Sequence, residues 1–141
     1  MSLLAAALLL SAASAAPPPA VSKADLRKKQ AATASVDAHR ADLVSLADQV
    51  WAFAETALRE TRSAALLADH AEQQGFRVER GVAGMPTAFV ASYGEGRPVI
   101  AVLGEYDALP GLSQKAVPER AAQQEGAPGH GCGHNLLGAA S

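Results

Sequence analysis

A run of five apolar residues, Val99-Ile100-Ala101-Val102-Leu103, leads directly into Gly104-Glu105-Tyr106-Asp107-Ala108-Leu109-Pro110. The run does not alternate with polar residues, which is typical of a strand buried on both faces, as in the centre of an α/β sheet. Pro110 would end such a strand because proline donates no hydrogen bond to a sheet. We therefore predict a buried third strand over residues 98–103 that delivers residues 104–110 at its carboxyl end.

Two carboxylates follow this predicted strand. Glu105 and Asp107 are two residues apart, so on an extended backbone both side chains point the same way. Open α/β sheets place their sites at the carboxyl ends of strands. Paired acids there can bind a metal, orient a ligand histidine or accept a proton. A solvated strand end that carries two acids is the alternative interpretation.

The only cysteine lies in a glycine-rich stretch, Gly129-His130-Gly131-Cys132-Gly133-His134-Asn135. A thiolate and an imidazole at the spacing of Cys132 and His134 can hold one divalent transition metal. His130 is a weaker candidate, as a partner that orients a ligand. The alternatives are a buried cysteine and surface histidines in a glycine loop. Two ligands do not hold a catalytic metal, so further ligands would have to come from elsewhere.

Two helices are predicted upstream of the strand. Apolar residues recur at helical spacing over residues 36–58. A second helix would be capped by the hydroxyl of Thr61 or Ser63 and would end at Gly75. These helices would pack on the sheet.

The remaining segments predict a mixed sheet and a long loop. Residues 76–80 alternate apolar and polar, and residues 87–93 form a second strand pattern. Gly94-Glu95-Gly96 would form a tight, hairpin-like connection to the third strand. Residues 111–131 are rich in Gly, Pro and Gln without periodicity, so we expect a loop that borders the site. The predicted fold class is α/β.

Composition and the first residues limit the class of protein. The chain has 141 residues and a net charge of −2, and no basic stripe indicates nucleic-acid binding. Residues 1–16 match the apolar region and small-residue cleavage zone of a signal peptide, although no Lys or Arg lies near Met1. The apolar run is too short to span a membrane. We predict a periplasmic or secreted protein with a linker or solvated lead-in over 17–35; a cytoplasmic protein with an Ala-rich leader is the alternative.

Taken together, these segments resemble the M20 metallopeptidase and amidohydrolase family. The resemblance is carried by the motif from Leu103 to Pro110 (LGEYDALP), the loop after it, and the motif from Gly129 to Gly138 (GHGCGHNLLG). They are similar in particular to the aminobenzoyl-glutamate hydrolase B-subunit branch, as is the segment from Gly81 to Val90. The resemblance covers about residues 36–141 and implies the N-terminal part of an M20-type zinc-peptidase catalytic domain.

The resemblance also implies a reaction and residue roles. Members hydrolyse amide bonds, often of N-acyl or aminobenzoyl amino acids or dipeptides, with two zinc or manganese ions per complete site. Cys132 and His134 match metal ligands, and Asp107 matches the catalytic acid that orients the metal centre. Glu105 stands where many relatives carry an aspartate. Asn135 also replaces an aspartate of other members.

The same resemblance places the rest of the site beyond Ser141. The family's general base, a glutamate, its further ligands and a lid domain used for dimerisation have no counterpart in these residues. We therefore expect a truncated chain that is inactive alone, and a full-length homodimer or dimer with a related subunit. The alternatives are a small metal-binding or thiol module, and a nonfunctional structural fragment with an exposed sheet edge.

Overall fold

The computed structural model describes residues 21–141, and the chain divides between residues 35 and 36 into two compact units. Residues 23–35 of the expected lead-in belong to helix α1 (Lys23–Ala38), which runs across this division and has no buried residue. The hydroxyl of Ser22 accepts a hydrogen bond from the Asp25 amide at 3.1 Å and starts this helix. The signal peptide predicted over 1–16 lies outside the described residues. Across residues 21–141, none of the helices combines the length and apolar character needed to cross a membrane.

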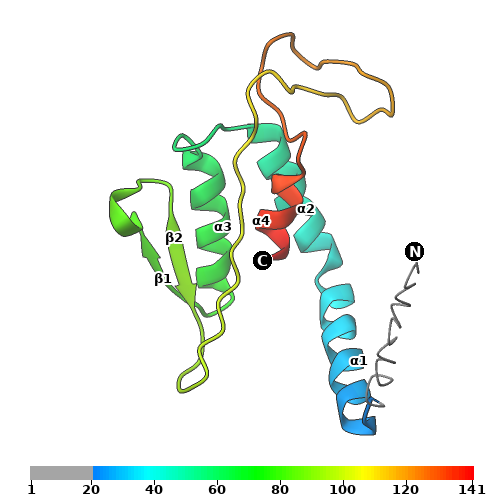
Figure 1. Cartoon of the computed structure of the whole chain (residues 1–141), viewed down its shortest axis with the longest axis vertical. Helices are drawn as coiled ribbons and strands as arrows, with labels where there is room; N and C mark the ends of the chain where they lie inside the picture. The colour runs from blue at the N-terminus through cyan, green and yellow to red at the C-terminus, as the bar shows by residue number, and fades with distance from the viewer. Residues whose placement is uncertain (1–20) are drawn as a thin grey trace, which may run out of the picture. The chain divides into compact units, whose positions relative to one another are not determined.

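The second unit contains three helices and one small sheet. Its elements are α2 (Arg40–Phe53), α3 (Thr61–Gln73), β1 (Arg77–Arg80), the 3₁₀ turn η1 (Val82–Gly84), β2 (Phe89–Ser92) and α4 (His134–Ala140). Helix α3 contacts both strands and α2, and α2 also packs against α4 (Figure 1). The buried apolar residues come mainly from the two long helices: Leu46, Ala47, Val50, Leu67, Ala68 and Ala108.

Helix α3 begins at Thr61, in the stretch 61–63 where a helix start was predicted, but the predicted cap is wrong. Neither Thr61 nor Ser63 caps the helix with its hydroxyl. The carboxylate of Glu55 instead accepts the backbone N–H groups of Arg62 (3.1 Å) and Ser63 (2.9 Å) and the hydroxyl of Ser63 (2.9 Å). Burial alone would raise the pKa of Glu55, but these hydrogen bonds and that from the Arg62 side chain lower the pKa below its usual value. The first turn of α3 therefore depends on an ionised Glu55.

Glu55→Gln is expected to destabilise the second unit above pH 5 by about 1.5 kcal/mol, since hydrogen bonds to a charged acceptor are lost. The folded-state pKa is depressed, so the contribution of Glu55 is present above the unfolded pKa near 4.5 and disappears as pH falls through the folded pKa. Urea unfolding between pH 7 and pH 3 should therefore show the two proteins converging in acid. Glu95→Gln, in the exposed turn after β2, is the control, and a gap that persists in acid would contradict the role of the charge.

The predicted first two strands are confirmed as an antiparallel hairpin. Arg77 pairs with Ser92 and Arg80 pairs with Phe89. Gly75, which follows α3, has a φ of +88°, a left-handed conformation that glycine adopts without steric cost, and it turns the chain from the helix into β1.

The third predicted strand is absent, and the prediction of its burial is wrong. Residues 98–103 are extended but belong to no strand, and they make no backbone hydrogen bond to another described segment. The exposed fractions are 81% for Val99, 83% for Ile100 and 90% for Leu103. The two-stranded sheet does not reach this segment, so its apolar side chains have no neighbouring strand or helix to cover them. The predicted mixed sheet is therefore not formed among residues 21–141. The predicted turn over 94–96 is present, with positive φ at Gly94 and Gly96, but it leads from β2 into a segment that pairs with no strand.

The loop after this segment is long, as predicted. It leaves the structured part at Leu109 and returns at Gly129, and Figure 1 shows it reaching away from the helices. The side chain of Gln114 organises part of it by donating to the carbonyl of Glu119 (2.8 Å) and accepting from the amide of Ala121 (3.1 Å).

Candidate metal-binding site

Backbone hydrogen bonds bring three distant segments together around the predicted site. The amide of Ala108 donates to the carbonyl of Glu55, just after α2, at 2.7 Å. Leu109 and Gly129 exchange two hydrogen bonds of 2.9 and 3.0 Å. The acidic segment is thus fixed between the end of α2 and the start of the Cys/His motif.

His134 is the first residue of α4, and both of its ring nitrogens meet a predicted carboxylate. Its Nδ1 lies 2.8 Å from Oδ1 of Asp107, and its Nε2 lies 3.1 Å from Oε2 of Glu105. The histidine and Asp107 are largely buried, with side-chain exposures of 17% and 25%, whereas Glu105 is exposed. The two acids do face the same side, as their spacing predicts.

Tyr106, between the two acids, is anchored in the opposite direction. Its hydroxyl donates to the backbone carbonyl of Thr87, whose own hydroxyl donates to Glu60 at 2.8 Å. Burial and the nearby charge of Glu60 raise the pKa of Tyr106 to about 12, so the hydroxyl stays a donor. Because neighbouring side chains of an extended segment point to opposite sides, this anchor helps to keep Glu105 and Asp107 directed at His134.

Cys132 is an exposed, free cysteine. Among residues 21–141, no three His, Cys, Asp or Glu side chains are arranged to hold a metal ion. The donor chemistry nevertheless suits one. When Nδ1–H of a histidine donates to a carboxylate, Nε2 is left as the ligand atom, and thiolate, imidazole and carboxylate are all zinc ligands. The described residues therefore carry a partial ligand set that is not assembled.

His130 and Asn135 lie on either side of Cys132 and His134 in the sequence, and both contact α2. Nε2 of His130 lies 3.0 Å from the carbonyl oxygen of Val50, and Nδ2 of Asn135 donates to the carbonyl of Ala47 at 3.3 Å. Burial lowers the pKa of His130, which favours the neutral ring, and the carbonyl partner requires that its proton sit on Nε2. Asn135 was not predicted as a site residue. The available signal was the asparagine itself, which offers a hydrogen-bond donor at a position where the family that the chain resembles carries a carboxylate.

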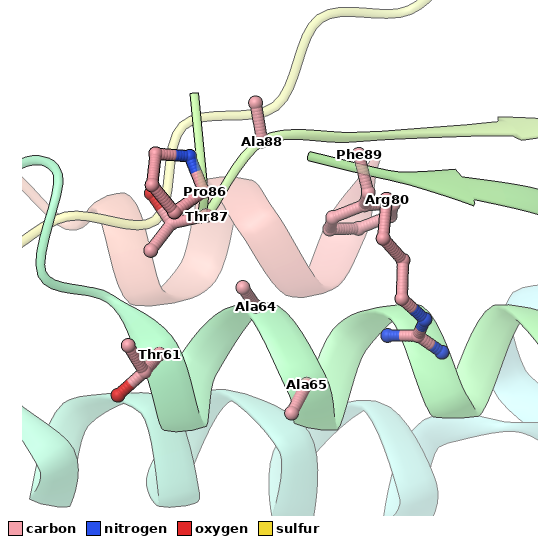
Figure 2. A pocket seen from close by; sticks show the side chains of 8 residues that line it. All are labelled: Thr61, Ala64, Ala65, Arg80, Pro86, Thr87, Ala88 and Phe89. Carbon is pink, nitrogen blue, oxygen red and sulfur yellow. The ribbon is translucent and has the colours of Figure 1, made fainter. Parts of the chain in front are cut away.

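A groove of about 160 Å³ lies elsewhere, between α3 and the hairpin (Figure 2). None of the candidate residues lines it. Its one ionised side chain, Arg80, is already paired with Asp69 at 2.8 Å and with Glu72 at 3.1 Å. Its two hydroxyl groups, those of Thr61 and Thr87, donate to the carboxylates of Glu55 and Glu60. The other lining side chains are apolar, so the groove adds nothing to the chemistry of the site.

Comparison with known proteins gives the family. No protein-family model matches the chain. Over 108 residues, however, the chain is 50% identical to the B subunit of p-aminobenzoyl-glutamate hydrolase from Escherichia coli (strain K12). The chain belongs to the M20 family, in the branch of this hydrolase subunit. The similarity covers 76% of the chain but only 22% of the length of the E. coli subunit. The M20 assignment from the two motifs is thereby confirmed, and the chain corresponds to a minor part of a hydrolase subunit.

Proposed function

We propose that this chain forms part of a metal-dependent M20 amidohydrolase that cleaves amide bonds of N-acyl or aminobenzoyl amino acids or dipeptides. The observation that carries the proposal is the placement of His134 between Asp107 and Glu105. The name of the E. coli relative supports the choice of an aminobenzoyl amide as substrate.

Each residue of the cluster has a role in this proposal. Asp107 accepts the Nδ1–H of His134 and fixes the ring orientation, so that Nε2 becomes the ligand atom. Cys132 and His134 would hold a divalent zinc or manganese ion, two of which serve a complete site. Such an ion polarises the amide carbonyl and lowers the pKa of a bound water. Glu105, whose Oε2 lies 3.1 Å from Nε2, would supply a further oxygen ligand.

The complete active site would need a general base and further metal ligands. Polypeptide with no counterpart in these residues would supply them, so this chain alone should not turn over substrate. The word "subunit" in the relative's name supports a partner, either a second copy or a related chain. We also propose export to the periplasm or medium.

Cobalt(II) titration of the chain tests the ligand assignment. The wild-type chain should bind cobalt weakly and show the absorption of a cobalt–thiolate bond. Cys132→Ser should abolish that absorption, and His134→Gln should weaken binding about ten-fold or more, since each removes one of few ligands. His70→Gln, in the last turn of α3, is the matched control. Unchanged cobalt binding in Cys132→Ser would contradict the proposal, and tight binding of one ion by the chain alone would favour the small-module alternative.

A further inference from the structure

We propose that His130 and Asn135 are positioning residues that clamp the turn carrying Cys132 and His134 onto two carbonyls of α2. The expected effect of this clamp on metal binding rests on the proposed function, in which Cys132 and His134 are metal ligands. The effect of the clamp on the orientation of His134 towards Asp107 does not depend on metal binding.

The two contacts bracket the ligand residues. His130 reaches the carbonyl of Val50 and Asn135 reaches that of Ala47, at 3.0 and 3.3 Å. Ala47 and Val50 are three residues apart in α2 and are both buried, so they lie on one face of the helix. The turn is thus held at both ends, with Cys132 and His134 between the two contacts.

Both contacts require a donor side chain. A backbone carbonyl only accepts, and that of Val50 already accepts the amide of Ala54 at 3.2 Å. Asn135 is 8% exposed, so its amide has little access to water as an alternative partner. A carboxylate at position 135 would place two acceptors together in a buried place, which costs free energy.

The turn itself has little stiffness without the clamp. Gly133 adopts a φ of +85°, and its amide donates to the carbonyl of His130 at 3.1 Å, which closes a tight turn between the two anchors. Glycines flank Cys132 on both sides, so the backbone has many accessible conformations when its ends are free. Together with the packing of α4 on α2, these two contacts restrict His134 to the position from which its Nδ1 reaches Asp107.

Matched variants separate the donor from the bulk of each side chain. Asn135→Asp keeps the shape but removes the donor. His130→Phe keeps a ring without a donor, whereas His130→Gln places an amide donor near the position of Nε2. In proton NMR, the Nδ1–H of His134 is identified by its loss in Asp107→Ala. We expect this signal to disappear in Asn135→Asp and in His130→Phe and to persist in His130→Gln, while helix content by circular dichroism stays near wild type.

Cobalt affinity gives a second measurement. It should fall about ten-fold in the two variants that lack a donor and be retained in His130→Gln, the usual effect of losing a residue that orients a ligand. If Asn135→Asp does not fold, the His130→Phe and His130→Gln pair decides the matter. A His134 signal that is the same in wild type and both donor-free variants would overturn the clamp. If the wild type binds no cobalt, the proposed metal role fails, but the NMR comparison still decides the clamp.

Discussion

Gly129→Ala is expected to cost about 3 kcal/mol or more in free energy of unfolding, which is the upper end for overpacking. A Cβ atom at this position would lie 2.1 Å from the carbonyl oxygen of Leu112 and 2.6 Å from its carbonyl carbon. Both are backbone atoms, and Gly129 is itself tied to Leu109 by two hydrogen bonds. Neither side of the loop can therefore move without breaking the backbone pairing between Leu109 and Gly129. Urea unfolding followed by circular dichroism measures the loss.

Gly131→Ala, two residues along the same loop, is the matched control. Its Cβ would come within 2.7 Å of Cδ1 of Leu112, the far end of an exposed side chain that can rotate away. We expect a loss below about 1 kcal/mol, as for ordinary surface changes. Equal destabilisation by the two substitutions would show that the close approach of Gly129 to the Leu112 backbone is not what makes Gly129→Ala costly.

The double substitution Ile100→Lys with Val102→Lys is expected to raise several-fold the concentration at which the chain begins to scatter light. These side chains are 83% and 71% exposed and lie on a segment whose backbone pairs with no other described segment. An extended, apolar and unpaired segment is a template for association between copies, and charges placed on it oppose that association. Static light scattering against protein concentration gives the measurement.

Val36→Lys with Val44→Lys controls for the added charge. These valines are 58% and 53% exposed, but they lie on α1 and α2, where the backbone is hydrogen-bonded within the helix. The control should shift the onset of scattering much less than the substitutions at 100 and 102. If both pairs act alike, net charge explains the effect and the unpaired segment does not.

Elements with local determinants could be predicted from the sequence. Helix α2 follows from apolar spacing, although it covers Arg40–Phe53 and not the whole of the predicted 36–58, since Ala54 adopts a left-handed conformation that ends it. Helix α3 lies between the predicted start at 61–63 and Gly75, and the β1–β2 hairpin follows from alternation and nearby turn residues. Whether residues 98–103 form a buried strand could not be predicted from their local sequence. An apolar run predicts burial, but burial also requires partners on both sides, and the described residues supply none.

Some features of the candidate site could likewise be predicted from local sequence, and others could not. The spacing of Glu105 and Asp107 predicts a shared direction, and the structure brings both to His134. The helix carbonyls that receive His130 and Asn135 lie 80 and 88 residues earlier in the chain. No local pattern encodes such a pairing, because it depends on how the whole unit folds. The placement of Glu55 at the start of α3 likewise depends on the path of the chain between two helices.

These long separations also bear on the order in which the unit assembles. The hairpin and the α2–α3 pair close short loops, whereas docking the 130–135 turn on α2 closes a loop of about 80 residues. Contacts between residues distant in sequence form more slowly than local ones. During synthesis, α2 leaves the ribosome long before its histidine and asparagine partners are made. The face of α2 that receives the turn is therefore made first, and the cluster of His134, Asp107 and Glu105 is the last part of this region to form.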